Sequence, residues 1–444
     1  MNKRLIHLLF FSFIAAATFG QGRPALREVT IYHDQAQKQL KAHYFIIGSD
    51  SSMIEGVFKT FHPNGKISSE GIFEKGKREG TFKDYYPDGQ LMREIPYHQG
   101  LKSGKVEVYN DQGVVIQQAT FKADTLVGEV TSYYADGRIR NQTAMAGGAP
   151  DGQVNDFYDN GKIRKSVVYK NGKPNGLTIT YYPNGHKSTE ATFVNGYMNG
   201  SYKTFFESGQ LQKSYEHLAG KKSGTFKEYY LSGQLKKSGT YKEGKVEGQV
   251  LAYYESGKLW QKNNFRNNEM HGDNYEYFPD GESVKRLIKI TDKGRHRQEL
   301  SYAENGVLIA DKKWANDLAI GIWQFYYAQN GKLKESCPYN KDRINGMRIF
   351  YYPNGQLEQE AQYHFGHLTG IVKNYSPSGK LTTLANYARG KKNGKYFTYH
   401  RNGIVAWEGE YVGDQKVGEW KYHNRRGAVK NTENYKRGVL VEEQ

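Results

Sequence analysis

One column of carboxylates is the first place to look for acid–base chemistry in this sequence. These glutamates stand five residues after a recurring glycine: Glu70, Glu94, Glu190, Glu360 and Glu408. Glutamine, serine or lysine stands at the same point in other units of the chain. A general acid and base must be held together at one place, and so irregular a column does not provide that. We therefore interpret these glutamates as partners in cross-strand ion pairs.

Other residues that could take part in catalysis or metal binding are equally isolated. His364 and His367 lie three residues apart in an expected loop, and without a third ligand they are predicted to be solvated histidines rather than a metal site. The many glycines recur as turns, not as a phosphate-binding loop between a strand and a helix. No serine or cysteine lies in a nucleophile context. The sequence therefore predicts no catalytic, cofactor-binding or metal-binding residue, no cofactor, and a protein that is not an enzyme.

A series of aromatic residues does favour binding. It is unbroken over seven successive units and consists of Tyr134, Tyr158, Tyr182, Phe206, Tyr230, Tyr254 and Phe278. Amphipathic rings suit both protein and sugar surfaces, so this candidate binding ladder is a hypothesis for a partner site. The alternative is that a twisted sheet buries the rings, or that they only favour β structure.

The elements that must position these residues are visible as a repeat. The unit from Gly80 to Ser103 reads GTFKDYYPDGQLMREIPYHQGLKS, two β-rich runs joined by Pro-Asp-Gly. Proline presets the first turn position and glycine accepts a positive φ, which predicts a hairpin with a type I turn and a glycine bulge. The turn glycine recurs sixteen times, 24 residues apart except for two spacings of 25: Gly65, Gly89, Gly113, Gly137, Gly161, Gly185, Gly209, Gly233, Gly257, Gly281, Gly306, Gly331, Gly355, Gly379, Gly403 and Gly427.

Three columns of apolar side chains accompany the turn glycine. In the unit quoted above they are Tyr85, Leu91 and Tyr97. If the turn pairs Tyr86 with Gln90, then Tyr85 lies opposite Leu91, and alternation along the strand places Leu91 and Tyr97 on one face. We therefore expect all three columns on a single core face, with the candidate binding ladder on the other. The predicted fold is all-β, an elongated twisted antiparallel sheet of serial β-hairpins with about 16 repeats of 24 residues.

The repeats also suggest a division of the chain. We expect a signal peptide, an N-terminal capping hairpin, regular repeats, irregular repeats with a bend, and further repeats with a C-terminal cap, over residues 1–20, 21–55, 56–281, 282–320 and 321–444. The bend is expected where the spacing lengthens and the core columns weaken at Ser283 and Lys289. A helical insert over residues 284–297 is the weaker alternative.

The first residues predict export. Lys3 and Arg4 precede an apolar run that ends in a small-x-small site before Gln21. An uncleaved anchor is the alternative, and no later segment is predicted to span a membrane. Cys337 is the only cysteine, so no intrachain disulfide can form, and we predict a buried, unreactive thiol. The formal charge of +17 is first explained as a solvated surface, and alternatively as attraction to an anionic partner.

The repeat resembles the MORN-repeat families. Segments that carry the likeness are GLTITYYPNGH from Gly176, GTFKEYYLSGQL from Gly224 and GMRIFYYPNGQL from Gly346. They are most similar to the variant MORN unit of bacterial secreted and envelope proteins. The resemblance implies an elongated antiparallel sheet of serial hairpins and carries over no catalytic residue. Many relatives are labelled antitoxin components of the YwqK type, and other MORN proteins act as scaffolds or bind membrane lipid.

Three functional hypotheses follow. The leading one is a non-enzymatic protein-interaction scaffold, exported to the periplasm, the outer surface or the medium, that binds another protein through its extended β surface. The first alternative is an antitoxin or immunity-type protein that neutralises a toxin. The second is binding of anionic lipid or polysaccharide at the cell envelope. Interleaved aromatics and lysines also suit single-stranded nucleic acid, but an exported protein seldom meets it, so no nucleic acid partner is expected.

Overall fold

The described part of the chain is antiparallel β structure. The structure is a computed structural model that describes residues 25–34, 36 and 38–444, so the predicted signal peptide lies outside the described residues. These residues form an open antiparallel sheet of 38 strands, with one short 3-10 helix, η1 (Asp292–Gly294), and no α-helix. The predicted all-β class and the serial hairpins are confirmed.

The chain divides into two compact units after Lys221. The first unit contains β1 (Leu26–Tyr32), β2 (Leu40–Ile47), β3 (Ile54–Phe61), β4 (Ile67–Glu74), β5 (Lys77–Tyr85), β6 (Leu91–His98), β7 (Leu101–Lys102), β8 (Gly104–Tyr109), β9 (Val115–Lys122), β10 (Thr125–Tyr133), β11 (Ile139–Ala146), β12 (Ala149–Phe157), β13 (Ile163–Lys170), β14 (Lys173–Tyr181), β15 (Lys187–Val194), β16 (Tyr197–Phe205) and β17 (Leu211–Leu218). The second unit contains β18 (Lys221–Tyr229), β19 (Leu235–Lys242), β20 (Lys245–Tyr253), β21 (Leu259–Arg266), β22 (Glu269–Met270), β23 (Gly272–Tyr277), β24 (Val284–Thr291), β25 (His296–Tyr302), β26 (Leu308–Ala315), β27 (Leu318–Tyr326), β28 (Leu333–Asn340), β29 (Arg343–Ile344), β30 (Gly346–Tyr351), β31 (Leu357–His364), β32 (His367–Tyr375), β33 (Leu381–Ala388), β34 (Lys391–Tyr399), β35 (Val405–Val412), β36 (Gln415–His423), β37 (Val429–Lys436) and β38 (Val439–Glu443).

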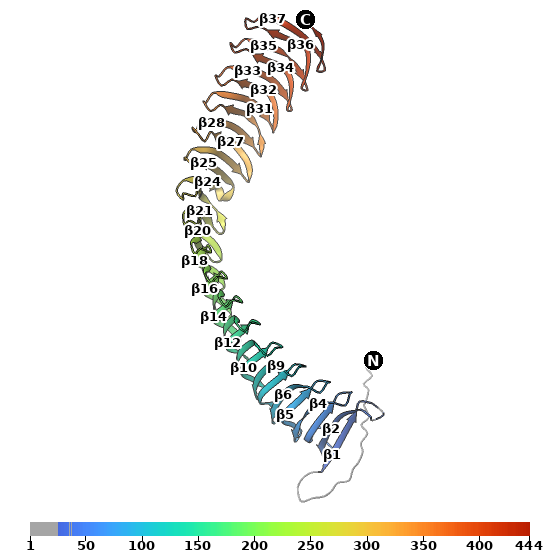
Figure 1. Ribbon diagram of the computed structural model, residues 1–444. Helices are drawn as coiled ribbons and strands as arrows, with labels where there is room; N and C mark the ends of the chain where they lie inside the picture. Colours follow the sequence, from blue (N-terminus) through green and yellow to red (C-terminus); the bar gives the residue numbers. More distant parts are fainter. Residues whose placement is uncertain (1–24, 35, 37) are drawn as a thin grey trace. The chain divides into compact units, whose positions relative to one another are not determined.

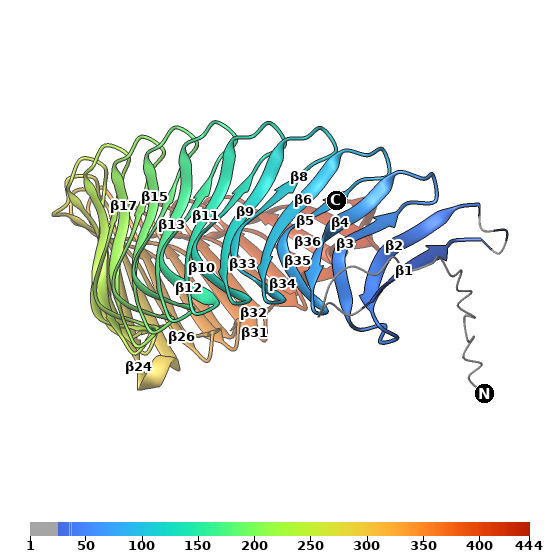
Figure 2. The same ribbon diagram turned by 90° about the horizontal axis from the view of Figure 1, so that it is seen from below.

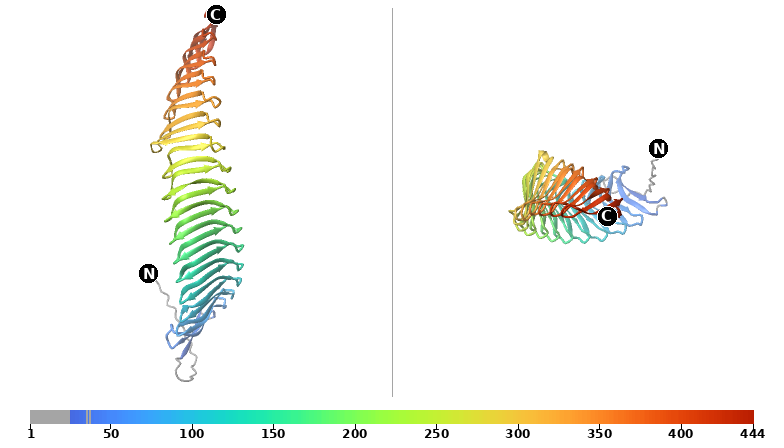
Figure 3. Two further views of the ribbon diagram at one scale, coloured as in Figure 1. Left: turned by 90° about the vertical axis from the view of Figure 1, so that its left-hand side faces the viewer. Right: turned by 90° about the horizontal axis from the view of Figure 1, so that it is seen from above.

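Within each unit the hairpins follow one another in sequence order (Figure 1). Strand β5 pairs with β4 before it and β6 after it, and other hairpins repeat this arrangement. Hairpin turns therefore line one edge of each unit and the connecting loops line the opposite edge (Figure 2). Short connections leave no other partner within reach, so consecutive strands lie side by side (Figure 3).

The turn chemistry agrees with the sequence. All sixteen turn glycines take a positive φ, between 70° and 96°. At the turn between β5 and β6, the Gly89 amide donates to the Tyr86 carbonyl at 2.8 Å, and the Tyr86 amide donates to the Gln90 carbonyl at 2.8 Å. This is the predicted type I turn with a glycine bulge, and a side chain at Gly89 would strain a left-handed backbone.

The expectation that three columns share one face is wrong. Tyr85 does lie opposite Leu91, but the pairing then shifts by one residue, because Met92 is an extra residue in β6. This bulge reverses the alternation, so Tyr97 lies on the opposite face from Tyr85 and Leu91. We call the two faces the Tyr85 face and the Phe82 face, after the residues that each carries in β5.

The buried part of the sheet lies on the Phe82 face. Phe82, Ile95 and Tyr97 form a cluster against which Phe58 and Phe73 pack. The rings of Phe82 and Tyr97 meet edge to face with centroids 5.3 Å apart. Because the sheet has one layer, each ring is covered by its neighbours in adjacent strands rather than by a second sheet.

Small residues opposite these rings make the close packing possible. Phe226 of β18 lies over Gly239 of β19, where an added Cβ would come within 2.7 Å of the ring. A Cβ added to Gly71 would likewise come within 2.6 Å of the Phe82 ring. Most equivalent positions carry other small or apolar residues, among them Ala361 and Cys337, and both of these are buried.

The irregular region differs from expectation. The extra residue of one long unit lies in the turn after Gly281, so β23 pairs Tyr277 with Val284 and Gly272 with Ile290. Val284 and Ile290 therefore fill the columns in which Ser283 and Lys289 were expected, and the predicted weakening at those two residues is wrong. The alternative of a helical insert is also wrong, since residues 284–297 form β24, η1 and the start of β25.

Candidate functional site

The glutamate column forms the predicted cross-strand ion pairs. On the Tyr85 face, Lys83 of β5 and Glu94 of β6 are directly opposite and 3.0 Å apart. Three further glutamates of the column have a lysine opposite them, in the pairs Lys59–Glu70 at 3.7 Å, Lys203–Glu190 at 3.3 Å and Lys373–Glu360 at 3.6 Å. Each carboxylate is neutralised by its own lysine, and the glutamates stand on separate hairpins, so they do not form a paired-carboxylate site.

Two of these glutamates also accept a hydrogen bond from a tyrosine of the next repeat. The Tyr85 hydroxyl donates to Glu70 at 2.7 Å, and the Tyr375 hydroxyl donates to Glu360 at 2.8 Å. Burial, followed by the carboxylate partner, raises the pKa of both tyrosines to about 12. These phenols are therefore protonated at neutral pH and link successive repeats rather than acting as bases.

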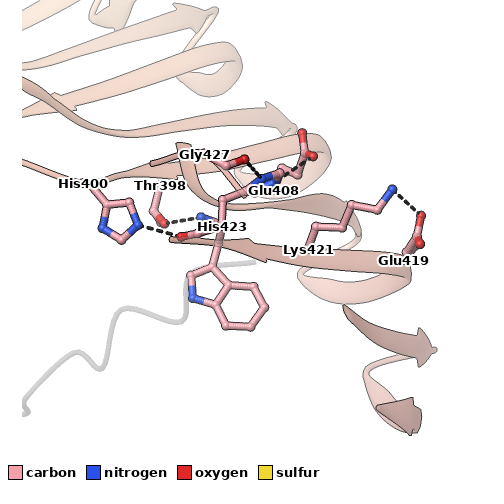
Figure 4. A network of polar contacts seen from close by, with 8 residues as sticks. Thr398, His400, Glu408, Glu419, Lys421, His423 and Gly427 are labelled. Atoms are coloured by element: carbon pink, nitrogen blue, oxygen red, sulfur yellow. Dashed lines mark hydrogen bonds and ion pairs between the residues drawn. The ribbon is translucent and has the colours of Figure 1, made fainter. Parts of the chain in front are cut away.

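The last repeat uses histidine in place of this tyrosine (Figure 4). The His423 ring contacts Glu408 at 3.0 Å through Nε2 and the Gly427 carbonyl at 3.2 Å through Nδ1. The His400 ring contacts the His423 carbonyl at 2.7 Å, and the Trp407 amide donates to the hydroxyl of Thr398 at 3.1 Å. The network repeats the tyrosine–glutamate contact with another side chain, so it is a structural link at this end of the array.

Among the described residues, the histidines and the cysteine do not gather into a site. His364 and His367 face each other across a two-residue turn between β31 and β32, and both are exposed. In the described ranges no group of three His, Cys, Asp or Glu residues could hold a metal ion. Cys337 is buried as predicted, at 1 % exposure, and burial raises the pKa of its thiol.

The candidate binding ladder lies at the turn edge of the Phe82 face. All seven rings are half-buried. Each of its five tyrosine hydroxyls donates to a backbone carbonyl of the next repeat: Tyr134 to Phe157, Tyr158 to Tyr181, Tyr182 to Phe205, Tyr230 to Tyr253 and Tyr254 to Tyr277, over 2.7 to 2.9 Å. The hydroxyls thus hold neighbouring repeats together and leave parts of the ring faces accessible.

Two hollows occur at this edge, one in each unit. The first unit has a hollow of about 530 Å³ lined by Ser132, Tyr134, Arg140, Asn141, Asp156 and Arg164. The second unit has one of about 540 Å³ whose lining includes Phe278, Ala303, Glu276 and Glu299. Sequence reasoning missed both hollows. The signals that could have found them were Ala303, which interrupts the aromatic series, and two arginines 24 residues apart.

Aromatic rings and basic side chains also contact each other on the Phe82 face. Arg78 lies over the rings of Phe82 and Tyr97, 4.9 and 5.1 Å from their centroids, and donates to the Tyr97 hydroxyl at 2.8 Å. Lys416 lies similarly over Trp420 and Tyr435, at 4.4 and 4.5 Å. Part of the excess positive charge is therefore used in cation–π contacts within the sheet.

Comparison with known proteins agrees with the repeat. The family model described as MORN repeat variant matches nine segments, residues 54–75, 78–99, 150–171, 174–195, 198–217, 222–243, 246–267, 344–364 and 368–388. No curated protein matches the chain. Within the described ranges, the chain contains no helix with the length and apolar character needed to cross a bilayer.

Three solved structures are similar over most of the chain at low identity. They are the TcdB2–TccC3 complex, its complex with Cdc42, and the Photorhabdus luminescens Tc holotoxin pore, each 11% identical over 94% of this chain, with TM-scores of 0.14, 0.12 and 0.13. The chain spans about a third of the length of those proteins, since it covers 31%, 30% and 30% of them. TM-scores this low carry no argument about fold or function.

Proposed function

The chain belongs to the MORN repeat variant family, and from this premise we propose that it is a non-enzymatic, exported scaffold that binds another protein through its sheet. Repeat arrays of this kind commonly mediate binding and are typically non-catalytic. The observation that carries the proposal is an exposed aliphatic stripe on three successive hairpins of the second unit. It consists of Ile322, Met347 and Ile371, which are 53 %, 41 % and 46 % exposed.

The three residues occupy the same place in their repeats. Ile322 lies opposite Pro338, Met347 opposite Gln362 and Ile371 opposite Asn386. They lie on the Tyr85 face, near the loop edge, with a spacing of about 10 Å from one hairpin to the next.

Polar residues flank the aliphatic stripe on both sides. The equivalent residues of the flanking hairpins are Gln298 and Lys395, each identified by its strand partner, Lys313 or Glu410. A short apolar patch with a polar border is typical of a protein–protein contact.

Partner capture tests the proposal. The full chain with an affinity tag is crosslinked in cells, and the captured protein is identified and titrated against the purified chain. In a variant with Ile322→Ser, Met347→Ser and Ile371→Ser, the affinity should fall at least tenfold. A control variant with Val57→Ser and Leu177→Ser changes exposed residues at the same repeat position in the first unit, and it should bind as wild type does.

Two results would contradict the scaffold proposal. One is the absence of any saturable protein partner, and the other is equal affinity of both variants. If the captured partner is a toxin, co-expression should also restore growth, which would refine the scaffold to an antitoxin or immunity-type protein. Export is tested separately, by fractionating cells that express the full chain.

A further inference from the structure

We propose that the hollow of the first unit binds an acidic saccharide, a sugar bearing a carboxylate. The hollow lies on the Phe82 face at the turn edge, between the hairpins β10–β11 and β12–β13. Its lining joins one aromatic ring, Tyr134, to hydroxyl, amide, guanidinium and carboxylate groups. An aromatic ring beside several convergent polar groups is the composition that recognises a sugar.

The charges of the hollow favour an anion. Arg164 lies 3.6 Å from Asp156, and Asn141 donates to the same carboxylate at 2.8 Å. Asp156 is therefore already partnered from two sides. Arg140 has no ion pair within the part of the chain that the structure describes, and it is exposed. Two guanidinium groups against one carboxylate leave the lining with an excess positive charge, and arginine is suited to bidentate pairing with a carboxylate.

The Tyr134 ring is fixed and its face is accessible. Its hydroxyl donates to the Phe157 carbonyl at 2.8 Å, which removes the freedom of the ring to turn away. In other repeats the bulge residue contacts the equivalent ring, as Lys236 does with Tyr230 at 5.3 Å and Lys334 with Tyr327 at 5.8 Å. Arg140 occupies the bulge position of its own hairpin, but no cation–π contact joins it to Tyr134 among the described residues.

The hollow of the second unit provides a contrast. It lies at the equivalent place in its repeats, but its lining contains Glu276, Glu299 and Glu304. Glu276 is paired with Lys285 at 3.1 Å and Arg286 at 2.6 Å, so neither cation is available. The two hollows share a position and differ in charge, which confines the proposal to the hollow of the first unit.

Titration calorimetry of the full chain tests the site with two probes, trigalacturonate as the acidic sugar and maltotriose as a neutral one. At 20 mM salt we expect saturable binding of trigalacturonate and none of maltotriose. Arg140→Gln should weaken binding about tenfold or more, and Tyr134→Ala, which removes the ring, should weaken it as well. The matched control is Arg138→Gln, an exposed arginine that pairs with Asp136 and is absent from the lining.

Three outcomes would overturn the proposal: no binding of trigalacturonate at 20 mM salt, equal weakening by Arg138→Gln and Arg140→Gln, or equal binding of maltotriose. Circular dichroism of each variant checks that the sheet is intact, and Arg140 is exposed, so its change should not affect folding. The site is independent of the aliphatic stripe, which lies on the Tyr85 face of the other unit. Failure of either proposal therefore leaves the other standing.

Discussion

The hydroxyl of Tyr85 donates a hydrogen bond of 2.7 Å to Oε1 of Glu70, a residue of the preceding repeat. The same contact recurs between Tyr375 and Glu360, and His423 takes the place of the tyrosine opposite Glu408. A polar pair on the Tyr85 face thus couples one hairpin to the next, while the rings of the Phe82 face pack from strand to strand.

This pair predicts a loss of stability at high pH. The pKa of Tyr85 is about 12 in the folded chain against an ordinary value of 10. Because the folded-state pKa is the higher one, the contribution is fully present below pH 10 and is lost as the pH rises through 12. Tyr85→Phe should lower the free energy of unfolding by about 1–2 kcal/mol at pH 8. Thermal unfolding from pH 8 to 12 should show the difference from wild type shrinking, and a constant difference would contradict the assignment.

Removing a hydroxyl from the candidate binding ladder should lower the stability of the chain, and adding one should raise it. Tyr182→Phe removes the donor to the Phe205 carbonyl, which lies 2.9 Å away, and should cost about 1 kcal/mol. Phe206→Tyr adds a hydroxyl at the equivalent position of the next repeat and should raise the melting temperature. Calorimetric melting of the two variants measures both effects. A ladder without a structural role would give no change in either variant.

The small residues beneath the rings limit the size of the side chain that these positions can hold. Gly239→Ala would place a Cβ within 2.7 Å of the Phe226 ring, and overpacking of this kind should cost about 1–3 kcal/mol. Combining it with Phe226→Val should recover much of the loss, because Val154 already pairs with Val167 in another repeat. Denaturant unfolding of both single variants and the double variant measures the coupling, and simple additivity would disprove the contact.

The thiol of Cys337 should be unreactive in the folded chain. It is 1 % exposed, and burial raises the pKa of the thiol, so a thiolate-specific reagent should label it only after unfolding. Cys337→Ala should change stability by less than about 1.5 kcal/mol, because alanine occupies the equivalent place at Ala361 and Ala385. Rapid labelling of the native chain at neutral pH would show that the residue is accessible.

Cross-strand ion pairs of the glutamate column were predictable from the residue types, but the lysine that each glutamate contacts was not. The pairing of Tyr85 with Leu91 alone would place Lys83 opposite Arg93, and only the extra residue Met92 brings Lys83 opposite Glu94. The two hollows were not predictable either. The space beside Tyr134 depends on where Arg140 and Asp156 of different hairpins come together, and no local sequence rule reports that distance.

Sequence alone was enough for the all-β class, the sixteen hairpins and the type I turn with its glycine bulge, since each depends on local backbone preferences and a repeat of 24 residues. The assignment of side chains to faces was decided by the tertiary structure. One extra residue, Met92, reverses the alternation between Leu91 and Tyr97, and nothing in its side chain marks it as a bulge. The hydrogen-bond partners of the ladder tyrosines were also decided by the tertiary structure, because each carbonyl that accepts from a hydroxyl belongs to the neighbouring repeat.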